Sequence, residues 1–311
     1  MDELLNRQYP GRRASALAVL GMLSSLAAFP AAATAFSFST GNTDGLMAMA
    51  SRPGGGGLSE IETADDFVLT QGTQLTGASF TGLLTGGASV SDITSVTVEI
   101  YRIFPKDSDV NRTSGSPTFS TSQVPTRVNS PSDVAFASRD STGGLSFTTN
   151  ELNPSFTASN SIQPGGIHPK PGQTTGGDGS VTGVEVQFDL NFLTSLDLPA
   201  DHYFFVPQVE LSNGEFLWLS APRPIVPPGT PFPAGATDLQ TWTRDQFLDP
   251  DWLRVGTDIV GPSQTAPAPT FNAAFSLNGT VPEPGTLALL GIGSLGLLGL
   301  NRRARRTQAI R

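Results

Sequence analysis

The chain has 311 residues, with 27 acidic and 18 basic side chains, a net charge of -9 and no cysteine. The lack of thiols excludes disulfides, thiolate zinc sites, iron–sulfur clusters and a cysteine nucleophile. The acidic balance argues against nucleic acid as a partner, because nucleic acid attracts Lys and Arg.

Residues 1–35 have the layout of a secretory signal peptide, with a basic stretch before an apolar run at 14–28. Ala33 and Ala35 form an A-x-A cleavage site before Phe36. We therefore expect an N-terminal signal helix, and export through the secretion translocon by the general secretory route.

The body divides into a short lead-in and one large domain. Residues 36–58 are rich in Gly and small side chains and are expected to be a flexible lead-in. Residues 59–280 lack any long apolar pattern of helical period and are expected to fold as one all-β domain. A single β-sandwich with jelly-roll-like topology is the predicted architecture, and two small β-modules that meet near residue 165 are the alternative.

Alternating side chains mark the clearest strands. In residues 93–104, Val96, Val98 and Ile100 fall on one face, and Tyr101 falls on the other. Residues 184–192 show the same period of two.

An Asn-Gly pair predicts a hairpin between two of these strands. Residues 203–211 and 215–219 flank Ser212-Asn213-Gly214, and both turn positions of such a hairpin need positive φ. The strands are joined by long Pro/Gly-rich loops at 105–131, 162–182 and 221–235.

The body contains no recognisable catalytic motif. Neither G-x-S-x-G nor H-E-x-x-H occurs, and the two histidines, His168 and His202, are expected to be solvated loop or strand-end residues. We therefore expect a protein that is not an enzyme and has no cofactor.

Acidic residues offer weak candidates for a calcium site. Ca²⁺ prefers oxygen ligands, which Asp107, Asp109, Asp249 and Asp251 could supply, although none lies in a D-x-[DN]-x-[DN]-G loop. Asp65-Asp66 is a further acidic pair, and carboxylates that cap turns are the alternative interpretation.

Tryptophan side chains are candidates for stacking on sugar rings. Trp242 and Trp252 flank a polar, turn-rich segment and are expected at the surface as carbohydrate contacts. Trp218 alternates with Phe216 along a predicted strand and is expected in the core.

The C-terminal end has three parts. Pro282-Glu283-Pro284 precedes an uncharged apolar run of 15 residues, 286–300. The run is shorter than the roughly 20 residues that cross a bilayer, and it predicts a single, marginal transmembrane helix. A basic stop follows, made of Arg302, Arg303, Arg305 and Arg306, which predicts a cytoplasmic C-terminal end.

These three parts resemble the PEP-CTERM sorting domain of Gram-negative bacteria, over residues 281–306. The resemblance implies that Pro282, Glu283 and Pro284 are the recognition element for an exosortase. It also implies a transient stay in the inner membrane, export to the cell surface or extracellular matrix, and association with exopolysaccharide and biofilm.

Together, the patterns predict an exported, non-enzymatic surface or matrix protein whose β domain associates with exopolysaccharide. A self-assembling surface-layer component is one alternative. A secreted polysaccharide hydrolase is the other, and it requires two carboxylates in a cleft.

Overall fold

The computed structural model describes residues 33–108, 129–167, 174–247 and 252–282. The expected signal helix and C-terminal transmembrane helix lie outside these residues. Within the described residues, no helix is long and apolar enough to cross a membrane.

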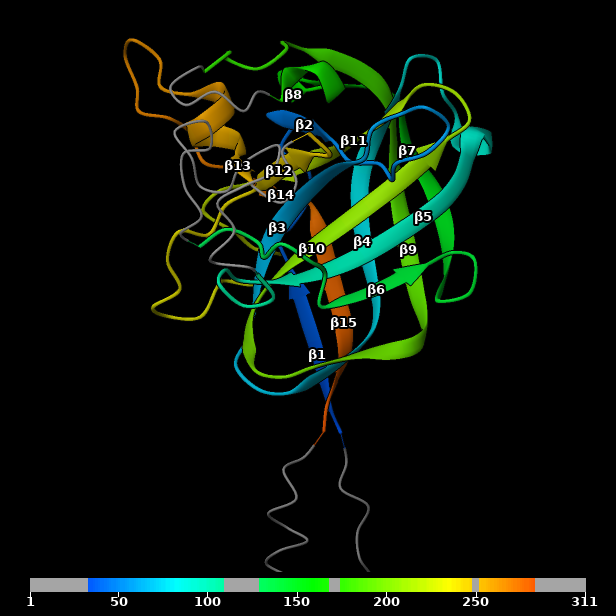
Figure 1. Cartoon of the computed structure of the whole chain (residues 1–311), viewed down its shortest axis with the longest axis vertical. Coiled ribbons are helices and arrows are strands. Elements are labelled where there is room, and N and C mark those ends of the chain that lie inside the picture. The colour runs from blue at the N-terminus through cyan, green and yellow to red at the C-terminus, as the bar shows by residue number, and fades with distance from the viewer. Residues whose placement is uncertain (1–32, 109–128, 168–173, 248–251, 283–311) are drawn as a thin grey trace, which may run out of the picture. The chain divides into compact units, whose positions relative to one another are not determined.

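Strands dominate the described residues and form two sheets, which confirms the all-β class (Figure 1). The first sheet has nine strands: β1 (Thr34–Ser39), β15 (Phe275–Val281), β4 (Thr73–Thr85), β11 (Glu215–Ala221), β2 (Met47–Ala50), β8 (Asn160–Ile162), β14 (Asn272–Ala273), β7 (Leu145–Ala158) and β9 (Val181–Leu198). The second has six: β13 (Leu253–Arg254), β12 (Trp242–Asp245), β3 (Ile61–Leu69), β10 (Asp201–Leu211), β5 (Ile93–Arg102) and β6 (Ala137–Asp140). The more specific jelly-roll topology stays a prediction.

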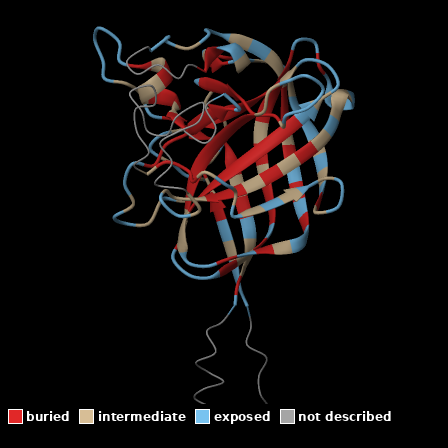
Figure 2. Ribbon diagram, viewed as in Figure 1, coloured by how far each residue is buried: buried red, intermediate tan, exposed pale blue. Residues whose placement is uncertain are grey.

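The main core lies where β10 of the second sheet packs on the first sheet. The ring of Phe205 on β10 stacks on Phe275 at 5.2 Å between centroids and lies 6.4 Å from Phe80 on β4. Trp218 on β11 lies in the same core and is fully buried, as expected. The buried residues gather between the two sheets (Figure 2).

A second, smaller core covers the opposite face of the second sheet. It is formed by Ala64, Tyr101, Phe204, Val206, Trp242 and Trp252. The predicted alternation of β5 is confirmed, because Val96, Val98 and Ile100 join the main core. Tyr101, on the other face, is also buried, because the second core covers that face.

The segment expected as a flexible lead-in contains strands. β2 and most of β1 fall within residues 36–58, and β1 pairs antiparallel with β15 from Thr34 opposite Val281. Phe38 is buried against Phe275, which explains why this end of the chain joins the sheet. Cleavage before Phe36 would leave β1 two residues shorter.

The predicted hairpin around Asn213-Gly214 is wrong. β10 pairs with β3 and β5, whereas β11 pairs with β4, β2 and β14, so the turn connects the two sheets. Gly214 has the predicted positive φ, 79°, but Asn213 does not. One edge of β10 pairs with β5 up to the turn, and the other pairs with β3 over residues 201–205.

We predict that Gly82→Ala destabilises the fold. A Cβ at this position of β4 would meet the ring of Phe216 and lie 2.7 Å from the main-chain oxygen of Leu217. Overpacking of this kind typically costs about 1–3 kcal/mol. Urea unfolding measures the change, and Gly143→Ala, whose Cβ meets no atom within 4 Å, is the control. Equal stabilities of the two variants would contradict this packing.

Candidate functional site

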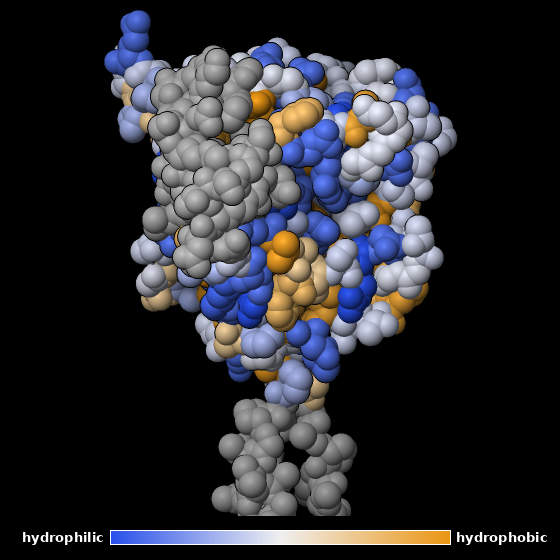
Figure 3. All heavy atoms as spheres, viewed as in Figure 1, coloured by the Kyte–Doolittle hydropathy of each residue, from blue (hydrophilic) through white to orange (hydrophobic). Residues whose placement is uncertain are grey.

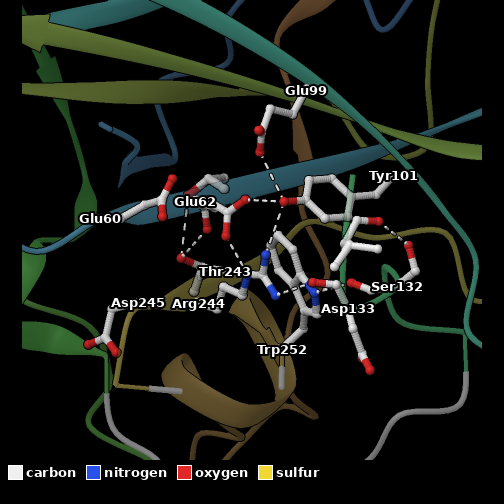
Figure 4. Close-up of polar contacts among 12 residues, drawn as sticks. Glu60, Glu62, Glu99, Tyr101, Ser132, Asp133, Thr243, Arg244, Asp245 and Trp252 are labelled. Atoms are coloured by element: carbon white, nitrogen blue, oxygen red, sulfur yellow. Dashed lines mark hydrogen bonds and ion pairs between the residues drawn. The ribbon is translucent and has the colours of Figure 1, made fainter. Parts of the chain in front are cut away.

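Three strands of the second sheet bring ionisable side chains together on its outer face. Glu62 on β3 lies directly opposite Arg244 on β12 in the antiparallel register. Glu99 and Tyr101 share one face of β5. We call these four residues the carboxyl–tyrosine cluster (Figure 4).

Hydrogen bonds close the cluster around the tyrosine hydroxyl. The Tyr101 Oη lies 2.7 Å from Glu62 Oε1 and 2.9 Å from Glu99 Oε2, and Arg244 Nη2 donates to it at 3.0 Å. Arg244 Nε donates to the other oxygen of Glu62. Both oxygens of Glu62 are therefore engaged, and its side chain is almost fully buried.

Aromatic rings hold the guanidinium in place. The Arg244 Cζ lies 4.4 Å from the ring centroid of Trp252 and 5.3 Å from that of Tyr101, which is cation–π range. Trp252 is itself fixed, because its Nε1 donates to the main-chain oxygen of Ser132 at 3.0 Å. The guanidinium is thus oriented by an ion pair and by two ring faces.

The environment shifts the proton affinities within the cluster. Burial, assisted by the charge of Glu62, raises the pKa of Glu99 to about 7. Burial and the same charge raise the pKa of Tyr101 far above its usual range, so the phenol stays protonated.

The Tyr101 hydroxyl has a single hydrogen to share between the two carboxyl groups. A phenol donates only one hydrogen bond, yet Tyr101 lies within bonding distance of both carboxyl groups. A protonated Glu99 can donate to the Tyr101 oxygen while Tyr101 donates to Glu62. Loss of that proton would leave two carboxylates competing for one hydrogen.

The cluster forms the wall of an open pocket of about 270 Å³. The lining adds further polar side chains to the cluster: Glu60, Asp133, Asp245 and Gln246. Carboxylate and amide oxygens outnumber donors, so the pocket suits a ligand with several hydroxyl donors or a cation. The described residues contain no group of three or more His, Asp or Glu side chains placed to hold a metal ion.

The tryptophans expected as sugar contacts are buried. Trp242 and Trp252 have 0% exposure, so the prediction that they lie at the surface is wrong. The polar sequence around them hid the second core, into which both rings pack.

The candidate calcium ligands do not come together in the described residues. Asp109, Asp249 and Asp251 lie outside them. Asp107 forms an ion pair with Arg102, which lowers its pKa through hydrogen bonding. The Asp107 carboxylate bonds this guanidinium, whereas the alternative interpretation expected a bond to its own main chain.

The buried acidic pair Asp65-Asp66 and the partly exposed His202 form a separate group. His202 lies at the start of β10, as predicted, but it is only partly exposed, because its ring pairs with the fully buried Asp66. Asp65 accepts hydrogen bonds from the Ala273 N–H at 2.8 Å and from Thr241 Oγ1 at 3.2 Å. His168 lies outside the described residues.

Sequence reasoning missed Glu62 and Arg244. The only sequence signal for them was that each is a charged residue within a strand-forming segment. Charged residues are rarely found in a strand as buried as β3. Their contact joins positions 182 residues apart, which a single sequence does not predict.

We predict that Glu99→Gln removes part of the pH dependence of stability. The folded pKa of about 7 exceeds the ordinary value of 4.5, so folded Glu99 keeps a proton that the unfolded chain has released. The free energy of unfolding should therefore fall as pH rises from about 4.5 to about 7, by about 2 kcal/mol from this group. Glutamine cannot ionise, so urea unfolding should show the variant gaining on the wild type over this range. Parallel curves would contradict the assignment, and Glu151→Gln on exposed β7 is the control.

Comparisons with known proteins identify the C-terminal end alone. Residues 280–306 match the PEP-CTERM protein-sorting motif, which confirms the resemblance seen in the sequence. No curated protein and no solved structure matches the chain. The match begins at Thr280, inside β15, and Pro282 is exposed at the end of the described residues. The chain therefore carries a PEP-CTERM motif, the signal of an exported, transiently membrane-anchored protein that is sorted by an exosortase.

Proposed function

We propose that this exported protein is a non-catalytic component of the cell surface or extracellular matrix, and that its β domain binds exopolysaccharide. The observation that carries the proposal is the open pocket beside the carboxyl–tyrosine cluster. Glu62, Glu99 and Arg244 in its wall project from paired strands, so this part of the wall is held in place before a ligand arrives.

The pocket has the chemistry that sugar hydroxyls need. Glu60, Glu99, Asp133 and Asp245 present oxygen acceptors, and the amide of the exposed Gln246 both donates and accepts.

An exposed aromatic residue follows a pocket-lining residue in the sequence. Phe247 follows Gln246 and is 67% exposed, so its face is available for a sugar ring in the role expected of the tryptophans. The visible face of the molecule mixes polar and apolar side chains (Figure 3), which is compatible with a hydrated polymer.

The geometry of the two carboxyl groups favours binding over hydrolysis. Glycosidases separate their carboxyl groups by about 5–5.5 Å or 6.5–9.5 Å, so that the sugar bond or a water fits between them. Here the Tyr101 hydroxyl fills the gap between Glu62 and Glu99 and bonds both.

One observation favours a polysaccharide hydrolase as the second candidate. Glu99 has a pKa of about 7, and the neighbouring Glu62 forms an ion pair with Arg244. A protonated carboxyl group beside an ionised one is the arrangement in which a glycosidase uses the first as general acid. Hydrolysis would require Tyr101 to move aside.

We predict that the purified β domain is retarded on affinity gels that contain the host's exopolysaccharide. The variant Gln246→Ala/Phe247→Ala should weaken retardation about tenfold, because it removes an amide and a ring from the proposed contact surface. Leu193→Ala, which truncates a side chain 59% exposed elsewhere, should have no effect.

The same mixtures are assayed for new reducing ends. No retardation of the wild type would contradict polysaccharide binding. Reducing ends that form with the wild type but not with Glu99→Gln would replace the proposal with the hydrolase.

A further inference from the structure

A second pocket, of about 450 Å³, lies between the proline-rich segment 221–235 and the residues around β14. Its volume is in the range of sites for small ligands. The argument uses these lining residues: Arg223, Pro224, Ile225, Pro231, Phe232 and Asn272.

Arg223 is unusual among the cations of the described residues. Each described Lys and Arg other than Arg139 and Arg223 forms an ion pair with a carboxylate. Arg139 instead donates to main-chain oxygens on β6 and β9. Arg223 is exposed and makes a single side-chain hydrogen bond, from Nη1 to Asn272 Oδ1 at 2.8 Å.

That single bond orients the guanidinium. Asn272 is 1% exposed, and its Nδ2 donates to the main-chain oxygen of Pro222 at 3.3 Å. The amide is therefore fixed between the two segments, and it holds one arm of Arg223. The remaining N–H groups of the planar fork are left for a ligand, and such a fork matches a carboxylate.

The buried acids Asp65 and Asp66 do not occupy this fork. Burial raises the pKa values of both, and the charge of Arg223 opposes that rise without a hydrogen bond to either. Asp65 and Asp66 already bond Ala273, Thr241, Gln240 and His202. Arg223 therefore retains its bonding capacity toward the pocket.

The other walls are apolar and partly rigid. Phe232 packs on Phe38 at 5.6 Å between centroids, and Ile225 packs against the main core. Pro224 and Pro231 present ring faces that lose little entropy when a ligand contacts them. A ligand for this pocket needs one negative group and an apolar face.

We infer that this pocket binds an acidic sugar unit, with the sugar carboxylate on Arg223 and the C–H face of the ring on the apolar walls. A uronate has both features. The acidic pocket beside Glu99 would repel a uronate and suits neutral sugars. The two pockets would therefore bind different sugar units of one polymer. The inference rests on the proposed function and specifies the charge class of the polysaccharide.

Titration calorimetry of the full β domain tests this with three probes: a uronic acid oligosaccharide, its carboxyl-reduced neutral counterpart and a sulfated neutral oligosaccharide. The wild type should bind the uronate oligosaccharide at least tenfold more tightly than the reduced one, and affinity should fall as salt rises. Equal affinities for the two would overturn the inference without any variant. Preference for the sulfated probe over the uronate would overturn the carboxylate assignment.

Two variants then locate the site. Arg223→Gln should lose at least tenfold in uronate affinity and leave binding of the reduced oligosaccharide unchanged, whereas Arg223→Lys should retain part of it. Arg139→Gln is the matched control and should bind as the wild type does. Unchanged uronate affinity in Arg223→Gln would overturn the site.

The results separate the two proposals. Neutral binding that depends on Gln246 and Phe247, without a preference for uronate, would leave the proposed function standing and remove this inference. Uronate binding that depends on Arg223, without neutral binding, would support this inference and remove the pocket beside Glu99 as a sugar site.

Discussion

The fold depends on three carboxylates that β3 carries into the interior. Glu62, Asp65 and Asp66 are 4%, 0% and 0% exposed, and burial raises the pKa values of the two aspartates. A buried polar or charged group without a partner destabilises the fold. Each bonds a different distant segment: Glu62 the guanidinium of Arg244 on β12, Asp65 the main-chain N–H of Ala273 on β14, and Asp66 the imidazole of His202 on β10. One strand near the start of the body therefore fixes several segments that follow it.

The candidate site is a consequence of this constraint. Arg244 must reach Glu62, and its guanidinium lies over Trp252, which draws the following segment across the outer face of the second sheet. The same segment buries Tyr101. Glu99 then lies close to the negative charge of Glu62, which, together with burial, disfavours the ionised form of Glu99. The pocket keeps its shape because its wall is part of the folding core, so ligand binding would need little rearrangement.

The sequence predicted what depends on local pattern. Alternation along β5, burial of Trp218 and the C-terminal motif each follow from neighbouring residues, and all three are confirmed. Features that depend on distant contacts were missed. Trp242 is flanked by polar residues in the sequence, yet it is buried. Its burial depends on the second core, which forms only when segments far apart in the chain meet. Asn213-Gly214 predicted a turn correctly, but local signals do not state which sheet receives the next strand.

A double-mutant cycle on Glu62 and Arg244 tests the central claim most directly. Arg244→Met should destabilise the β domain by about 3 kcal/mol, because it leaves the Glu62 charge buried without a partner. Glu62→Gln/Arg244→Met should recover much of that loss, with a coupling of at least about 2 kcal/mol in urea unfolding. If the two changes instead add to within about 0.5 kcal/mol, the buried carboxylates of β3 do not hold the fold together.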